Sequence, residues 1–80
     1  MVNRNEIVLR NLAFNLKHWR KIQGFTQEDL AYNSGLALSQ IARIETCRIN
    51  PTILTLSIIV DTLGIKLSDL LSFETKTKLI

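Results

Sequence analysis

Ser39, Gln40 and Arg43 are the residues of this chain best suited to specific hydrogen bonding, and they lie on one side of an expected helix. The guanidinium group of an arginine can donate two parallel hydrogen bonds to guanine, and a glutamine amide can pair similarly with adenine. Leu38 and Ala42 lie near the same side, where an apolar side chain either meets a thymine methyl group or belongs to the core. The pattern predicts base contacts by Leu38, Ser39, Gln40 and Arg43, with Arg43 as the main determinant. The alternative for Arg43 is a surface ion pair with a nearby carboxylate.

These residues belong to the second of two short helices that flank a turn. The first helix should begin at Thr26, a good N-cap residue, and end at Gly35, which can adopt the positive φ that closes a helix. The second helix should stop before Pro51, because a proline pushes the residue before it out of helical geometry. Its apolar residues recur at helical spacing: Leu36, Leu38, Ile41 and Ile44. We therefore expect helices over about residues 26–34 and 37–46.

Three more helices complete the expected organisation. The first covers about residues 5–23 and is amphipathic, with an apolar side formed by Leu12, Leu16 and Trp19. Another begins near Thr52 and runs to Leu63, and a short one follows at residues 66–71. Residues 74–80 lack a helical stripe and are expected to form a frayed tail. The prediction is an all-α fold of five helices in one domain spanning residues 1–80.

The composition fits a small helical domain and excludes several classes of function. Of the 80 residues, 46% are hydrophobic, with one Pro, three Gly and a single Cys, and the net charge is +3. A lone Cys47 excludes a disulfide framework and a cysteine-based zinc site, and no catalytic or cofactor-binding motif is present, so we expect no enzyme, no cofactor and no metal. No run is long and apolar enough to span a bilayer, and we expect no membrane partner and a cytoplasmic location. The basic excess is compatible with nucleic acid.

The chain resembles the Cro/lambda-repressor type of helix-turn-helix domain, the Xre family, over roughly residues 12–71. The first half of the family pattern is met by Arg20, Gly24, Phe25, Thr26, Gln27, Leu30 and Ala31. The second half is met by Gly35, Leu36, Ile41, Glu45, Asn50, Pro51, the pair Leu63-Gly64 and the pair Leu70-Leu71. The chain departs from the pattern in two places. Ala37 stands where a Ser or Thr often caps the second helix of the motif, and Cys47 replaces the Gly that usually follows it.

This resemblance implies a five-helix, lambda-repressor-like fold that binds double-stranded DNA in a sequence-specific way and regulates transcription. It implies that Arg20 and Glu45 form a structural ion pair. Positions that contact the phosphate backbone in the family, or add positive charge near it, are here Thr26, Gln27, Lys21, Arg48 and Asn50. Without the resemblance, Gln27 could equally be a solvated polar residue.

The fourth expected helix adds an inference about assembly. With Leu56, Ile59 and Leu63 packed inward, Leu54 and Ile58 should project from the opposite side one turn apart. Exposed aliphatic side chains on so small a domain indicate a partner surface, and a symmetric homodimer is the simplest choice. Two copies of the reading helix could then enter successive major grooves of a palindromic operator.

Small regulators of this kind are similar to restriction-modification controller proteins, phage repressors and antitoxins, and the sequence leaves these possibilities open. An antitoxin would need a further surface for its toxin, for which residues 74–80 are the obvious candidate. The alternative class is a protein-interaction module that keeps the fold without reading DNA and uses Leu54, Ile58 and the C-terminal leucines.

Overall fold

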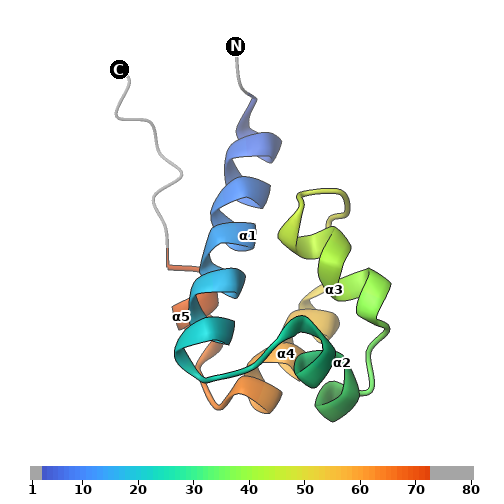
Figure 1. Cartoon of the computed structure of the whole chain (residues 1–80). Helices are drawn as coiled ribbons and strands as arrows, with labels where there is room; N and C mark the ends of the chain where they lie inside the picture. Colours follow the sequence, from blue (N-terminus) through green and yellow to red (C-terminus); the bar gives the residue numbers. More distant parts are fainter. Residues whose placement is uncertain (1–2, 73–80) are drawn as a thin grey trace.

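The structure is a computed structural model that describes residues 3–72, and within that range it contains five helices and no strand. In chain order the helices are α1 (Arg4–Ile22), α2 (Gln27–Ser34), α3 (Leu38–Glu45), α4 (Ile53–Leu63) and α5 (Leu67–Leu70). The long α1 packs against α3 and α5, while α2 contacts both α3 and α4 (Figure 1). The predicted all-α class with five helices is confirmed. The expected frayed tail, residues 74–80, lies outside the described residues.

The helix ends follow from local chemistry. Thr26 caps α2 and Thr52 caps α4, each with a side chain that accepts a hydrogen bond from a backbone N–H in the first turn. Gly35 and Gly64 end the same two helices in the left-handed conformation, with φ of 78° and 73°. At the start of α1, Asn3 forms a capping box with Glu6, so this helix begins one residue before the predicted position.

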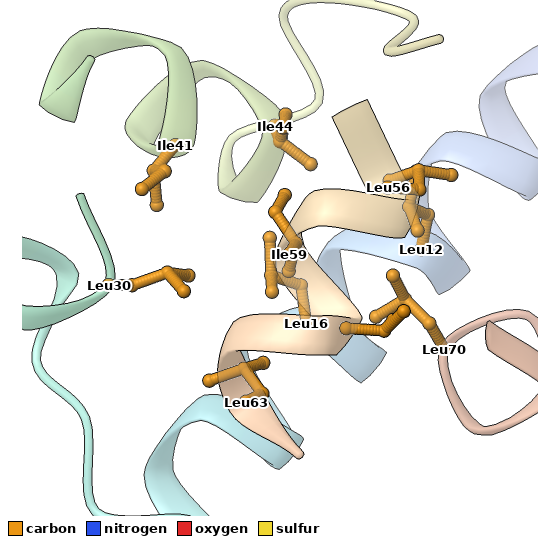
Figure 2. Close-up of a cluster of buried hydrophobic side chains, with 10 residues drawn as sticks. Leu12, Leu16, Leu30, Ile41, Ile44, Leu56, Ile59, Leu63 and Leu70 are labelled. Carbon is orange, nitrogen blue, oxygen red and sulfur yellow. The ribbon is translucent and has the colours of Figure 1, made fainter. Parts of the chain in front are cut away.

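A single cluster of aliphatic side chains joins the five helices (Figure 2). Each helix contributes to it, and its members are Leu12, Leu16, Leu30, Ile41, Ile44, Leu56, Ile59, Val60, Leu63 and Leu70. Trp19 was predicted on the apolar side of α1, but it is only partly buried and packs against the edge of this cluster. The cluster fixes α3 by its inner side and leaves its outer side free for other contacts.

The ends of α3 differ from those of the other long helices. It spans Leu38–Glu45, one residue shorter at each end than predicted, and its N-cap residue, Ala37, has no side-chain acceptor for the first turn. After the helix, Cys47 adopts φ of 62°, the left-handed region that glycine usually occupies. Cys47 thus takes the backbone conformation of the Gly that it replaces in the family pattern. Packing and tertiary contacts, more than its own caps, must therefore hold α3 in place.

Candidate nucleic-acid interface

The outer side of α3 presents the side chains predicted to contact bases. Ser39 and Arg43 are exposed, and Gln40 is half-buried. An open hollow of about 280 Å³ runs along this side and continues past the end of the helix. Its lining residues are Ser39, Ala42, Arg43, Thr46 and Arg48. We call this surface the α3 reading face.

Arg43 keeps its hydrogen-bonding capacity in the free protein. Among residues 3–72 the one ion pair joins Arg20 to Glu45, so Arg43 has no carboxylate within ion-pair distance in this range. Its planar guanidinium therefore retains the donor fork that recognises a guanine edge. The alternative of a surface ion pair finds no partner among these residues.

Leu38 lies at the solvent-exposed start of α3, and 41% of its surface is accessible. The sequence left open whether Leu38 belongs to the core. The core position at this end is instead taken by Leu36, which packs against the hydrophobic cluster. Leu38 therefore adds an exposed apolar group beside Ser39, of a kind that can meet a thymine methyl group.

A buried ion pair anchors the end of α3 to α1. Arg20 Nε donates to Glu45 Oε2 at 2.7 Å and Arg20 Nη2 donates to Glu45 Oε1 at 2.9 Å. Arg20 Nη1 also donates to the carbonyl oxygen of Phe25 at 2.9 Å. The accessible fractions of Arg20 and Glu45 are 8% and 3%, and the hydrogen bonds to Glu45 raise the pKa of Arg20 above its ordinary value. This two-point contact sets the position of α3 relative to α1.

Gln27 extends this ion pair to α2. Its Nε2 donates to Glu45 Oε1 at 2.9 Å, so the Gln27 side chain is half-buried and bonded to the protein. It is therefore more than the solvated polar residue that the sequence also allowed. Because an amide nitrogen carries two N–H groups, the second one remains for a phosphate oxygen. Gln27 thus joins the start of α2 to the end of α3.

Thr26 and Asp29 form a capping box at the N-terminus of α2. Asp29 N donates to Thr26 Oγ1 at 2.9 Å, and Thr26 N donates to Asp29 Oδ2 at 3.0 Å. These contacts with Thr26, first through its backbone and then through its side chain, lower the pKa of Asp29. Helix geometry leaves the backbone N–H groups of Gln27 and Glu28 without intrahelical acceptors, so they can bind an anion.

The loop between α3 and α4 brings further polar groups beside the α3 reading face. Arg48 and Asn50 are both exposed, and Arg48 lines the hollow of that face. Asn50 lies by a second hollow, of about 320 Å³, whose lining residues are Arg4, Asn5, Val8, Leu9 and Asn50. The cation Arg4 is therefore placed next to the loop. No pattern in the sequence predicts a role for Arg4, because only the folded loop brings residue 50 to the start of α1.

Lys21 occupies a different surface from the other predicted phosphate contacts. It is exposed near the end of α1 and shares a hollow of about 330 Å³ with Phe14, Lys17 and His18. None of the residues that line this hollow belongs to α3 or to the following loop. A direct role in positioning DNA is thus less well supported for Lys21 than for Gln27 or Arg48.

The apolar patch on α4 is shifted relative to the prediction. Leu54 is 71% exposed as expected, whereas Ile58 is only half-exposed. Side chains four residues apart on a helix are neighbours, so Leu54 and Ile58 still lie on one side of α4. Ile53, which the sequence analysis did not single out, is also exposed, because it lies in the first turn of α4. We call Ile53, Leu54 and Ile58 the α4 apolar patch.

Residues 3–72 contain no group of three His, Cys, Asp or Glu side chains that could hold a metal ion. Over the same range, no helix combines the length and the apolar character needed to cross a membrane.

Comparison with known proteins gives one family and several similar structures. A family model described as helix-turn-helix (HTH_3) matches residues 16–70. A search of curated proteins found no match. The restriction-modification controller protein C.AhdI from Aeromonas hydrophila is 27% identical, with 78% of this chain and 94% of that chain covered and a TM-score of 0.75.

Two other structures extend the comparison. The restriction-modification controller protein C.Esp1396I was solved as a tetramer in complex with its natural 35 base-pair operator. It is 39% identical to this chain, and the match covers 74% of this chain and 78% of that chain with a TM-score of 0.70. An HTH_3 family transcriptional regulator from Vibrio cholerae is 25% identical with a TM-score of 0.81, and the match covers 89% of this chain but 40% of that chain.

Proposed function

Because the chain belongs to the helix-turn-helix (HTH_3) family of DNA-binding transcription regulators, we propose that it binds a specific operator in double-stranded DNA and regulates transcription by occupying that operator. The observation that carries this proposal is the α3 reading face, where Arg43, which has no ion-pair partner among residues 3–72, stands on a helix fixed by a buried ion pair. A rigid helix with a free guanidinium suits base recognition in the major groove. The protein would therefore act by binding DNA in the cytoplasm, without a catalytic step.

Base readout is assigned to the exposed side chains of α3. Arg43 contacts a guanine, Ser39 and Gln40 supply further hydrogen bonds, and Leu38 contacts a thymine methyl group. Arg43 has the largest role because a bidentate contact discriminates against a wrong base by roughly 1–3 kcal/mol.

Contacts to phosphate flank the reading helix on both sides and set its register on the duplex. Thr26 and Gln27 act on one side, at the N-terminus of α2, where helix N–H groups attract an anion. Arg48 and Asn50 act on the other side, and Arg4 adds charge next to Asn50. Lys21 contributes longer-range attraction to the duplex.

A homodimer formed through the α4 apolar patch would allow recognition of a palindrome. The patch is a set of exposed aliphatic groups on one helix, and a two-fold axis beside it would bury the same surface from each protomer. The two reading helices would then lie about 34 Å apart in successive major grooves. The similar protein C.Esp1396I was solved on its operator as a tetramer, which supports an oligomer as the binding unit. By the same likeness we propose that this chain acts as a small controller of the restriction-modification type.

Selection of binding sites from a random pool of duplex DNA tests the proposal. We expect the selected fragments to share a palindromic sequence, and affinity for it to fall steeply with salt as phosphate contacts release counterions. The variant Arg48→Ala should weaken binding to all sequences alike and reduce the salt slope by about 1. Tyr32→Ala, which changes an exposed residue of α2, is the matched control for handling and concentration. Recovery of no common sequence would overturn operator recognition and favour the protein-interaction alternative.

A further inference from the structure

The outer face of α1 has no role in the function proposed above beyond the charge of Lys21. Phe14 is 66% exposed on this face, an unusual position for a phenylalanine in a small domain. Lys17, His18 and Lys21 surround it and line the same hollow of about 330 Å³. We call these four residues the α1 outer face.

This face carries positive charge, and the one acidic residue of α1, Glu6, lies in the first turn of the helix, about two turns before Phe14. Between Glu6 and Glu28 the sequence contains no Asp or Glu. Of the cations in this interval, Arg20 forms an ion pair with Glu45, whereas Lys17 and Lys21 have no carboxylate within ion-pair distance among residues 3–72. The surface therefore attracts a negatively charged group and offers it two ammonium ions.

The aromatic groups of the face are held in order. The rings of Phe14 and His18 are nearly parallel, with an interplanar angle of 8° and centroids 6.1 Å apart. His18 meets Trp19 edge to face at 5.4 Å, and Trp19 packs against the core. Phe14 thus stacks on a ring that itself contacts Trp19, and such ring contacts favour one orientation of its side chain.

The α1 outer face is separate from the other two surfaces. α1 packs against α3 and α5 through its buried side (Figure 1), and the hollow shares no residue with the α3 reading face or the α4 apolar patch. A ligand could therefore occupy the α1 outer face while α3 contacts DNA.

We propose that the α1 outer face docks an acidic segment of a second protein that also carries an apolar side chain. The carboxylates would pair with Lys17 and Lys21, and the apolar side chain would cover Phe14. A DNA backbone fits less well, because it matches the lysines but offers nothing to cover an exposed phenyl ring. Exposed aromatic residues are enriched at protein interfaces, and charge complementarity would orient the partner on this face. The regulator would thus hold a partner protein and DNA at the same time.

Titration with a short peptide of alternating Glu and Leu residues tests the proposal, with the changes in amide resonances followed by NMR. We expect the shifts to centre on Phe14, Lys17, His18 and Lys21, and a peptide with Gln in place of Glu to cause none. The variants Phe14→Ser and Lys17→Glu should each weaken peptide binding by at least about tenfold while binding to DNA persists. Tyr32→Ser removes an aromatic ring that is 88% exposed on α2, and should leave peptide binding unchanged.

Two results would overturn the proposal. One is peptide binding that is absent, or equal in wild type, Phe14→Ser and Lys17→Glu. The other is single-stranded DNA of equal charge that binds this face more tightly than the peptide and loses affinity in the same variants, which would make the α1 outer face a nucleic-acid surface. Because Lys17 is exposed, Lys17→Glu decides the question even if Phe14→Ser fails to fold.

Discussion

Removal of Arg20 tests how the fold holds its reading helix. Glu45 is 3% exposed in the wild type, and in Arg20→Ala its remaining side-chain partner among residues 3–72 is the Gln27 amide, 2.9 Å from its Oε1. The Phe25 carbonyl also loses the hydrogen bond from Arg20 Nη1. A buried charge without its counterion is costly, so we expect loss of stability to precede any direct effect on recognition.

The expected loss is large relative to the total. Breaking a buried ion pair from one side costs roughly 3–5 kcal/mol. A domain of this length has a free energy of unfolding of about 4–12 kcal/mol, at ~0.05–0.15 kcal/mol per residue. The double variant Arg20→Ala/Glu45→Ala leaves neither charge buried. Its loss of unfolding free energy should be smaller than the sum of the losses in the two single variants, with a coupling energy of about 2–3 kcal/mol.

Urea unfolding followed by fluorescence measures these quantities, because Trp19 is the only tryptophan and lies next to Arg20. Each variant is measured at several protein concentrations, since assembly adds a concentration-dependent stability. Lys21→Ala removes the neighbouring exposed cation and should change stability by less than about 0.5 kcal/mol. A coupling energy near zero would refute the role assigned to the Arg20–Glu45 pair, and so would an equal loss in Lys21→Ala.

Three other predictions concern separate parts of the molecule. Cys47 has φ of 62°, so Cys47→Gly should be more stable than Cys47→Ala by about 1 kcal/mol in urea unfolding. Inside a helix the order of the two variants would be reversed. Equal stabilities of the two variants would argue against a left-handed conformation at residue 47. The pKa of Asp29 is lowered below 3.8 in the folded state, so its contribution to stability is present above that pH and is lost as the pH falls through the folded-state pKa. The difference in free energy of unfolding between wild type and Asp29→Asn should therefore shrink as the pH is lowered below 3.8. A difference that stays constant with pH would show that the contacts with Thr26 do not stabilise the charged form of Asp29. If the protein forms the proposed dimer, Leu54→Glu should convert it to a monomer in sedimentation while its circular dichroism stays helical, because the substitution puts an unpaired charge from each protomer into the α4 apolar patch. Tyr32→Glu is its exposed control, and a Leu54→Glu variant that still sediments as a dimer would place the interface elsewhere.

Features decided by neighbouring residues could be predicted from the sequence. Thr26 and Thr52 begin helices and Gly35 ends one because caps depend on residues within one turn. The inward side of α4 followed from spacing alone, since Leu56, Ile59 and Leu63 recur at helical intervals.

Features decided by contacts between distant segments could not be predicted in this way. The hydrogen bond from Gln27 to Glu45 joins residues on different helices, and the motif pattern alone gave Gln27 only a phosphate role. Arg4 and Asn50 line one hollow because the loop after α3 returns to the start of α1. The bounds of α3 also differ from the predicted residues 37–46. Ala37 and Cys47, which flank this helix, both depart from the family pattern.

Affinity of Arg43→Ala for the selected operator and for each of its single-base variants tests most directly the claim that α3 reads DNA through Arg43. We predict that wild type discriminates at one or two positions of each half-site by roughly 1–3 kcal/mol, and that Arg43→Ala loses the discrimination at those positions while keeping it elsewhere. Arg48→Ala, measured in parallel, should weaken binding to every operator by a similar factor. If Arg43→Ala also weakens all operators equally and keeps the base preferences of wild type, then Arg43 contacts phosphate and α3 does not read the sequence through it.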